Sequence, residues 1–172
     1  MPTIGVAVAI PEPWATELQD YRTSVGDTTA TMIPTHITLV PPTEVPEGGL
    51  DDVEAHLEQA AGAVSAFSVH LRGTGTFRPV SPVVFVTLVE GISQCEQLAD
   101  ALRRGPLATD LEFPFHPHVT VAHHLSDQLL DQAFSDLAGF ECDFGVGEFH
   151  LYVHDAEHGW RPTRSFPLRP AD

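Results

Sequence analysis

The amino-acid sequence predicts an α+β fold in which two related half-domains share one cleft. A four-residue motif, His-apolar-Thr-apolar, occurs at residues 36–39 and again at 118–121, about half the chain length apart. Segments with strand and helix periodicity follow one another in the order βαβαββαβαββ. Several strands are joined by short connections, which favours antiparallel pairs beside helices over a doubly wound parallel sheet.

The first half of the chain is expected to alternate strands and helices. An apolar run predicts a buried strand at its start, and apolar side chains at helical spacing predict the helices. Gly26 is expected to end the first helix, and Pro41 and Pro42 are expected to end the first His-Thr strand. The predicted elements are a strand over 3–10, a helix over 11–25, a loop over 27–33, the His-Thr strand and a helix over 50–64.

The second half predicts more strands than helices. The glycines of the segment 73–79 lack phosphate-loop spacing, so they are interpreted as turn residues. Ser126 is a good helix N-cap, and Gly105 and Gly139 are expected to end helices. The predicted elements are strands over 67–71 and 83–89, a helix over 92–104, the second His-Thr strand, a helix over 126–137, and strands over 149–153 and 166–168.

Size and charge restrict the classes of function. The 172 residues predict a single domain, 1–172, large enough to bury a core. The chain has 8 basic residues, all arginine, against 24 acidic ones, which gives a net charge of −16. Because polymer binding depends on cations that release counterions, a long nucleic acid is not expected as a partner, whereas a small or terminal phosphate ligand is. The acidic surface favours a monomer.

Other features of the composition predict an ordinary cytoplasmic protein. The longest apolar run, from Ile4 to Ile10, is too short to cross a membrane. Met1-Pro2-Thr3 lacks the basic start of a signal peptide. Cys95 and Cys142 lie in a predicted helix and a predicted strand without metal-type spacing, so both are expected to be buried free thiols.

The repeated motif carries the chemistry. Positions i and i+2 of a strand point to the same face, so each copy presents one imidazole and one hydroxyl together. In-line displacement at phosphorus needs one proton removed and another delivered on opposite sides, which two histidines can do near neutral pH without a metal. The candidates are His36 and His118, with Thr38 and Thr120 as donors to the phosphate oxygens.

The chain resembles the 2H phosphoesterase superfamily, which includes the bacterial 2′-5′ RNA ligases and the cyclic phosphodiesterases. The resemblance rests on residues 34–39, Phe77, residues 117–122 and the closing segment 160–168, and it covers nearly the whole chain. It implies a bilobal fold with two antiparallel sheets, flanked by helices, around a central cleft. The implied reaction is the opening of a 2′,3′-cyclic phosphate or a related cyclic phosphodiester of a small nucleotide or an RNA end, without metal or cofactor.

The resemblance also implies roles for the motif residues. His118 is expected to activate water, His36 to protonate the leaving oxygen, and Thr38 and Thr120 to hold the phosphate. Some members run the reverse reaction and join RNA ends through a 2′-5′ linkage. Relatives closest to those ligases often carry an arginine where this chain has His123. Together with the net charge, this departure disfavours RNA-polymer binding and ligation.

Two other classes of function stay open at this point. One is a metal-dependent enzyme that uses the histidine cluster His116, His118, His123 and His124. The other is a non-catalytic nucleotide binder with the same two-lobed fold. Residues that could add to any of these sites are Arg78, Arg161 and Arg164 as cations near the phosphate, and Phe77 or Trp160 as a surface on which a base stacks.

Overall fold

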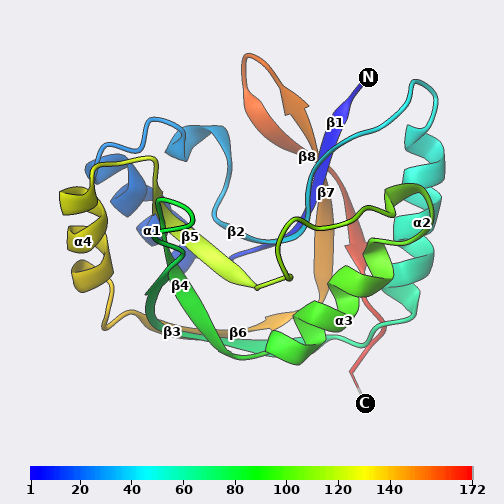
Figure 1. Ribbon diagram of the computed structural model, residues 1–172. Helices are drawn as coiled ribbons and strands as arrows, with labels where there is room; N and C mark the ends of the chain where they lie inside the picture. Colours follow the sequence, from blue (N-terminus) through cyan, green and yellow to red (C-terminus); the bar gives the residue numbers. More distant parts are fainter. Residues whose placement is uncertain (172) are drawn as a thin grey trace.

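The computed structural model describes residues 1–171, which form two four-stranded antiparallel sheets and four α-helices (Figure 1). The first sheet has the strand order β2-β1-β7-β8, and the second has the order β5-β4-β3-β6. This architecture confirms the α+β prediction. The strands are β1 (Thr3–Ala9), β2 (His36–Glu44), β3 (Phe67–Thr76), β4 (Val83–Glu90), β5 (His118–His123), β6 (Glu141–Val146), β7 (Glu148–Asp155) and β8 (Gly159–Pro167).

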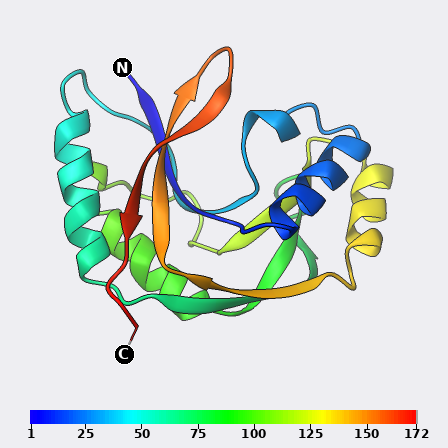
Figure 2. The same ribbon diagram turned by 180° about the vertical axis from the view of Figure 1, so that it is seen from behind.

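The helices cover the sheets in pairs. Helices α1 and α4 pack on the second sheet, and α2 and α3 pack on the first (Figures 1 and 2). Ser126 caps α4 as predicted, because its hydroxyl accepts a hydrogen bond from the Leu129 amide at 3.3 Å. No helix of residues 1–171 has the length and apolar character needed to cross a membrane. The helices are α1 (Trp14–Ser24), α2 (Leu50–Gly62), α3 (Ile92–Leu102) and α4 (Asp127–Asp136), with short 3₁₀ turns at Ala30–Met32 and Gly105–Leu107.

The two lobes are not the two successive halves of the chain. Both ends of the chain build the first sheet, and the middle of the chain builds the second. Strand β6 contains Cys142, which was expected in a strand although the predicted order of elements leaves this strand out, and it runs into β7 after Gly147 alone. The chain therefore passes from one sheet directly into the other, and a single cluster of buried apolar side chains extends over both. Cys95 and Cys142 are buried free thiols, as predicted.

Strand β2 continues through the two prolines that were expected to end it. Pro41 and Pro42 lie within β2, which reaches Glu44. Proline is tolerated there because β2 is an edge strand, and the pairing with β1 is irregular opposite this point, between Ile4 and Val6. The sequence-based end of this strand was wrong because edge position depends on pairing that local sequence does not reveal.

Strand β3 likewise runs beyond its predicted end at Leu71. It reaches Thr76, with an irregular register between Leu71 and Thr74 where Gly73 has φ of +76°. A Cβ on Gly75 would lie 2.7 Å from the Phe85 ring, so only glycine lets that ring pack against the strand. The glycines predicted as turn residues therefore belong to a strand.

Both His-Thr motifs lie on edge strands, one in each sheet. β2 and β5 are the outer strands of their sheets, and they approach each other across the boundary between the lobes. In both motifs the histidine and threonine are half-buried and the apolar residues between and after them are fully buried. The alternation predicted from the sequence is confirmed, so each motif presents its two polar side chains on one face.

Candidate active site

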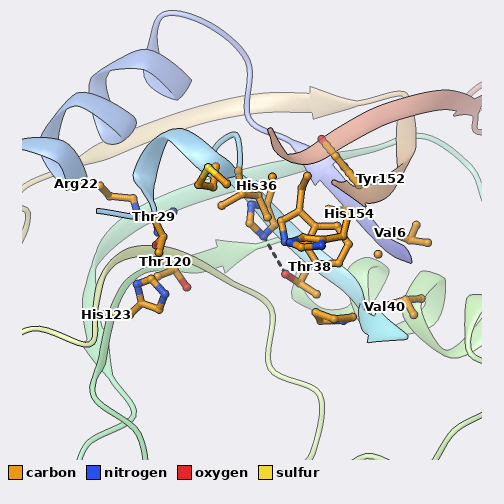
Figure 3. A pocket seen from close by; sticks show the side chains of 17 residues that line it. Val6, Arg22, Thr29, His36, Thr38, Val40, Thr120, His123, Tyr152 and His154 are labelled. Carbon is orange, nitrogen blue, oxygen red and sulfur yellow. Dashed lines mark hydrogen bonds between the residues drawn. The ribbon is translucent and has the colours of Figure 1, made fainter. Parts of the chain in front are cut away.

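A cleft of about 580 Å³ lies between the two His-Thr strands (Figure 3). The strands β1, β2 and β7 of the first sheet and the start of β8 form most of its wall, and β5 supplies the opposite side. One part of the lining is polar and the rest is apolar or aromatic. The polar part consists of Arg22, Thr29, His36, Thr38, Thr120, His123 and His154, and the remainder includes Met32, Ile33, Val40, Pro42, Tyr152 and Trp160.

His36 is fixed at both ring nitrogens. Nδ1 donates to the Pro34 carbonyl oxygen at 2.7 Å, so Nε2 accepts the hydroxyl of Thr38 at 3.1 Å. Burial lowers the pKa of His36 to about 4; the bond to Pro34 opposes this shift, and the charges of Arg22 and His118 add to it. The ring is therefore neutral near pH 7, with an unprotonated nitrogen beside Thr38.

His118 repeats the first half of this arrangement. Its Nδ1 donates to the His116 carbonyl oxygen at 2.7 Å, and burial lowers its pKa. The ring packs edge-on against Phe77, with 4.9 Å between ring centroids, and lies 5.3 Å from the ring of Phe85. His118 does not itself line the cleft, but Thr120 does, and the charge of His118 reaches His36.

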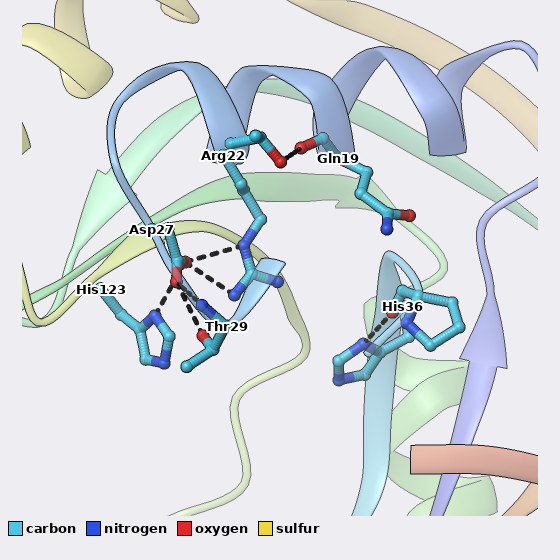
Figure 4. A network of polar contacts seen from close by, with 8 residues as sticks. Gln19, Arg22, Asp27, Thr29, His36 and His123 are labelled. Atoms are coloured by element: carbon cyan, nitrogen blue, oxygen red, sulfur yellow. Dashed lines mark hydrogen bonds and ion pairs between the residues drawn. The ribbon is translucent and has the colours of Figure 1, made fainter. Parts of the chain in front are cut away.

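A buried ion pair stands beside the cleft, and sequence reasoning missed it. Asp27 Oδ2 accepts from Arg22 Nε at 3.0 Å and from Nη2 at 2.8 Å, while Oδ1 accepts from the amide and the hydroxyl of Thr29 at 3.0 and 2.7 Å. The third partner of Oδ2 is Nδ1 of His123 at 3.0 Å (Figure 4). Burial raises the pKa of Asp27, but the bonds from Thr29 and Arg22 outweigh it and lower the pKa to about 2.

One signal in the sequence could have pointed to Arg22. It stands four residues after the fully buried Leu18 on the same helix, so an arginine occupies the buried face of α1. A buried arginine needs a charged partner. No pattern in the sequence connects it to Asp27 in the following loop or to His123 on β5.

The three arginines that were candidates for a cation near the phosphate are not among the residues that line the cleft. All three pair with carboxylates that do not line the cleft, whereas Arg22 lines it. The pairs are Arg78 with Asp127 and Asp131, Arg161 with Asp155, and Arg164 with Glu54 and Glu58. Of the two aromatic candidates, Trp160 lines the cleft and Phe77 packs against the second histidine.

The histidine cluster does not gather into a metal site. Within residues 1–171, no group of three or more His, Cys, Asp or Glu side chains is arranged to hold a metal ion. His116 and His118 have ring centroids 6.1 Å apart, and His123 directs Nδ1 at Asp27 instead. The sequence prediction that these residues could form a metal centre is therefore not supported by their positions.

Comparison with known proteins places the fold and the family. The family model described as the 2′-5′ RNA ligase superfamily matches residues 10–158. A Bacillus licheniformis protein that carries a provisional phosphoesterase name is 32% identical over 157 residues, which cover 88% of this chain and 92% of that protein. A Staphylococcus haemolyticus protein with the same kind of name is 26% identical over 168 residues, covering 96% and 98%.

Solved structures share this fold over nearly the full length of the chain. The protein TT0787 of Thermus thermophilus superposes with a TM-score of 0.72 at 25% identity and covers 100% of both chains. E. coli LigT in complex with 3′-AMP superposes with a TM-score of 0.69 at 21% identity, covering 98% of both chains. Other structures of LigT contain NADP⁺ or ATP.

Proposed function

The chain belongs to the 2′-5′ RNA ligase superfamily of phosphoesterases, and on that premise we propose that it opens 2′,3′-cyclic phosphates, or related cyclic phosphodiesters, without a metal. His36 and His118 are the general acid and base in this proposal. Thr38 and Thr120 donate hydrogen bonds to the non-bridging phosphate oxygens. The substrate is a nucleotide or the end of an RNA chain.

The observation that carries the proposal is the matched anchoring of the two histidines. Each ring donates Nδ1–H over 2.7 Å to a carbonyl oxygen two residues earlier, which leaves Nε2 as the reactive atom. The two rings stand on the edge strands of opposite sheets. Two proton-transfer groups carried by strands on opposite sides of the cleft would meet the requirement of in-line displacement at phosphorus.

In this reaction the base must remove one proton and the acid must donate another. The base removes a proton from water as the water oxygen attacks phosphorus, the ring P–O bond breaks, and the acid protonates the ribose oxygen that leaves. The low pKa of His36, beside the positive charge of Arg22, favours the neutral form and hence the role of base. His118 is then the acid, with the substrate's negative charge favouring its protonated form. This assignment reverses the one expected from the sequence.

The shape of the cleft supports a substrate of nucleotide size. Its polar part matches a phosphate, and Tyr152 and Trp160 offer aromatic surface for a sugar or a base. LigT, which shares the fold, binds small nucleotides in its solved complexes. The net charge of −16 disfavours a long RNA, and therefore also the ligation reaction.

The decisive experiment is hydrolysis of the four nucleoside 2′,3′-cyclic phosphates in excess EDTA. Wild type is compared with His36→Ala and His118→Ala, and with His70→Ala as a matched control, because His70 pairs with Glu141 on the second sheet and does not line the cleft. We expect turnover in EDTA and a loss of about 10²–10⁴-fold in each catalytic variant, the usual worth of a positioned acid or base. The product isomer identifies the oxygen that leaves.

Three results would overturn the proposal. Activity abolished by EDTA indicates a metal-dependent mechanism. Nucleotide binding that both alanine variants retain, with no turnover in the wild type, indicates a non-catalytic binder. Turnover unchanged in either variant removes that histidine from the mechanism.

A further inference from the structure

We propose that His123 is a proton-coupled anion contact: held by Asp27, its ring takes up a proton from solvent when a phosphate enters the cleft and donates Nε2–H to that phosphate. The inference rests on the proposed function only in identifying the anion as the substrate's phosphate. It adds a third histidine to the site, with a binding role that the two-histidine mechanism does not require.

A β-bulge turns His123 toward the cleft. Residues three apart on a regular strand point to opposite faces, so His123 would face away from Thr120. The register of β5 shifts instead: Phe85 pairs with Thr120 and the preceding Val84 pairs with Ala122. The extra residue leaves Val121 and Ala122 both fully buried, and His123 joins Thr120 in the cleft lining.

The bond to Asp27 decides which nitrogen of His123 faces a ligand. A carboxylate can only accept, so Nδ1 of His123 carries a proton and donates it over 3.0 Å. Nε2 is then the atom that gains or loses a proton. The side chain is 26% exposed, whereas the carboxylate that holds it is 2% exposed, so the ring is fixed at one end and accessible at the other.

Asp27 does not need His123 for its own hydrogen bonding. Its two oxygens already accept two bonds from Arg22 and two from Thr29. A ring that merely satisfied a buried carboxylate would be redundant here. The charge balance instead favours a binding role, because Arg22 neutralises Asp27 and a protonated His123 would leave one net positive charge beside the phosphate donors.

Three charged or titratable side chains lie beside His123, and His36 and His154 line the same cleft. Asp27 comes from the loop after α1, Arg22 from α1 itself, and His124 from the same chain segment with ring centroids 4.7 Å apart. The strand neighbour on β4 is Val83, which carries no charge. A bound anion favours a positive charge on a ring that donates a hydrogen bond to it. Anion affinity should therefore rise as pH falls.

Sulfate is the probe for the test, because its charge is constant between about pH 5.5 and about pH 8, whereas phosphate itself titrates in that range. Binding is followed by NMR through the amides of Thr38 and Thr120, and the ring signals of His123 report its protonation. The variants are His123→Gln, which cannot take up a proton, and His123→Arg, whose charge is fixed. His124→Gln is the matched control, since that exposed neighbour does not line the cleft.

We expect wild type to gain about tenfold more affinity than either variant between about pH 8 and about pH 5.5, as for one charge-assisted hydrogen bond. The variants keep His36, His118 and His154 and so supply the background. His123→Arg should bind with high affinity at both pH values, and His124→Gln should behave as wild type. Equal pH dependence in wild type and both variants, or its loss in His124→Gln, overturns the inference.

This test separates the two proposals. Sulfate binding needs no turnover, so proton-coupled binding without hydrolysis of any cyclic nucleotide leaves the inference standing and removes the proposed activity. Hydrolysis of a cyclic nucleotide with pH-independent sulfate binding leaves the proposed activity standing and removes the inference about His123. An unfolded variant would be evident from its NMR spectrum, and His123, half-buried at an edge strand, tolerates replacement better than the buried Asp27.

Discussion

His36 and His118 lie on different sheets, yet the same kind of hydrogen bond fixes both: each Nδ1 donates over 2.7 Å to the carbonyl oxygen of the residue two positions earlier. Each copy of the arrangement thus consists of a histidine, the carbonyl oxygen two residues before that histidine, and the threonine two residues after it. This bond fixes the tautomer and ring orientation of both histidines. The two differ in their surroundings, since His36 meets Thr38 and the charge of Arg22, and His118 meets aromatic rings.

The pH dependence of catalysis follows from this burial. The pKa of His36 is lowered to about 4, and that of His118 lies below its ordinary value of 6.5. Because kcat/KM reports the free enzyme, its bell-shaped profile should have both limbs below pH 6.5, whichever histidine is the acid. Steady-state rates on cyclic nucleotides between about pH 3.5 and about pH 8 provide the check. A plateau that extends to pH 8 would show that neither histidine acts as the acid.

The same burial makes stability fall in mild acid. Unfolded His36 has a pKa near 6.5 and folded His36 one of about 4, so the unfolded chain binds the extra proton in between. Stability is unaffected above pH 6.5 and declines as pH falls toward 4, by up to about 3 kcal/mol. Urea denaturation at several pH values should show this slope reduced in His36→Gln and intact in His158→Gln, on the exposed β7–β8 turn. Parallel slopes in all three proteins would contradict it.

The two threonines should respond differently to substitution. Thr38 donates to His36 Nε2, whereas the Thr120 hydroxyl makes no hydrogen bond to any residue of 1–171. Thr38→Val and Thr120→Val should each lower kcat/KM by about 10–100-fold, the worth of a bond to a charged group. Only Thr38→Val should raise the pKa of His36, because its hydroxyl stabilises the neutral ring. NMR titration of the ring signals tests this, and an equal shift in both variants would refute the distinction.

Gly159 holds the β7–β8 turn against the segment that lines the cleft. Its φ is +76°, and a Cβ there would lie 2.2 Å from the Met32 carbonyl oxygen. Gly159→Ala should therefore cost at least about 2 kcal/mol in unfolding free energy and raise KM, since Met32 and Trp160 both line the cleft. Gly139→Ala, with nothing within 4 Å and an ordinary φ, is the control for denaturation and kinetics. A fully stable Gly159→Ala would show that the turn can move away from Met32 at little cost.

Local patterns predicted most of the fold. The strand over 83–89, the His-Thr strands and the capped helix after Ser126 depend on nearby residues, and the structure has all of them within a few positions. The predicted ends failed where the outcome depends on distant pairing. Prolines are tolerated in β2 because that strand is at an edge, and Gly75 is a strand residue because Phe85 packs on it.

The candidate site likewise contains residues that local sequence predicted and residues that depend on distant contacts. His36, Thr38 and Thr120 line the cleft as the motif predicts, because alternation along a strand is a local property. The Arg22–Asp27–His123 network joins a helix, a loop and a strand, and its bond between His123 and Asp27 spans 96 positions. Its orientation also depends on a bulge whose presence is decided by the pairing of β4 with β5. No local periodicity encodes such an arrangement.

Because the chain passes from β6 into β7, the first sheet can be completed only late in the synthesis of the protein. A nascent chain that has reached Val146 already contains both histidines and both threonines, but β1 and β2 are then an isolated pair, which is marginally stable at best. β1 gains its second neighbour only when β7 emerges from the ribosome, and Trp160 follows later still. Prematurely terminated chains therefore carry the reactive side chains without the cleft. The cleft is complete only when the last strands have been synthesised.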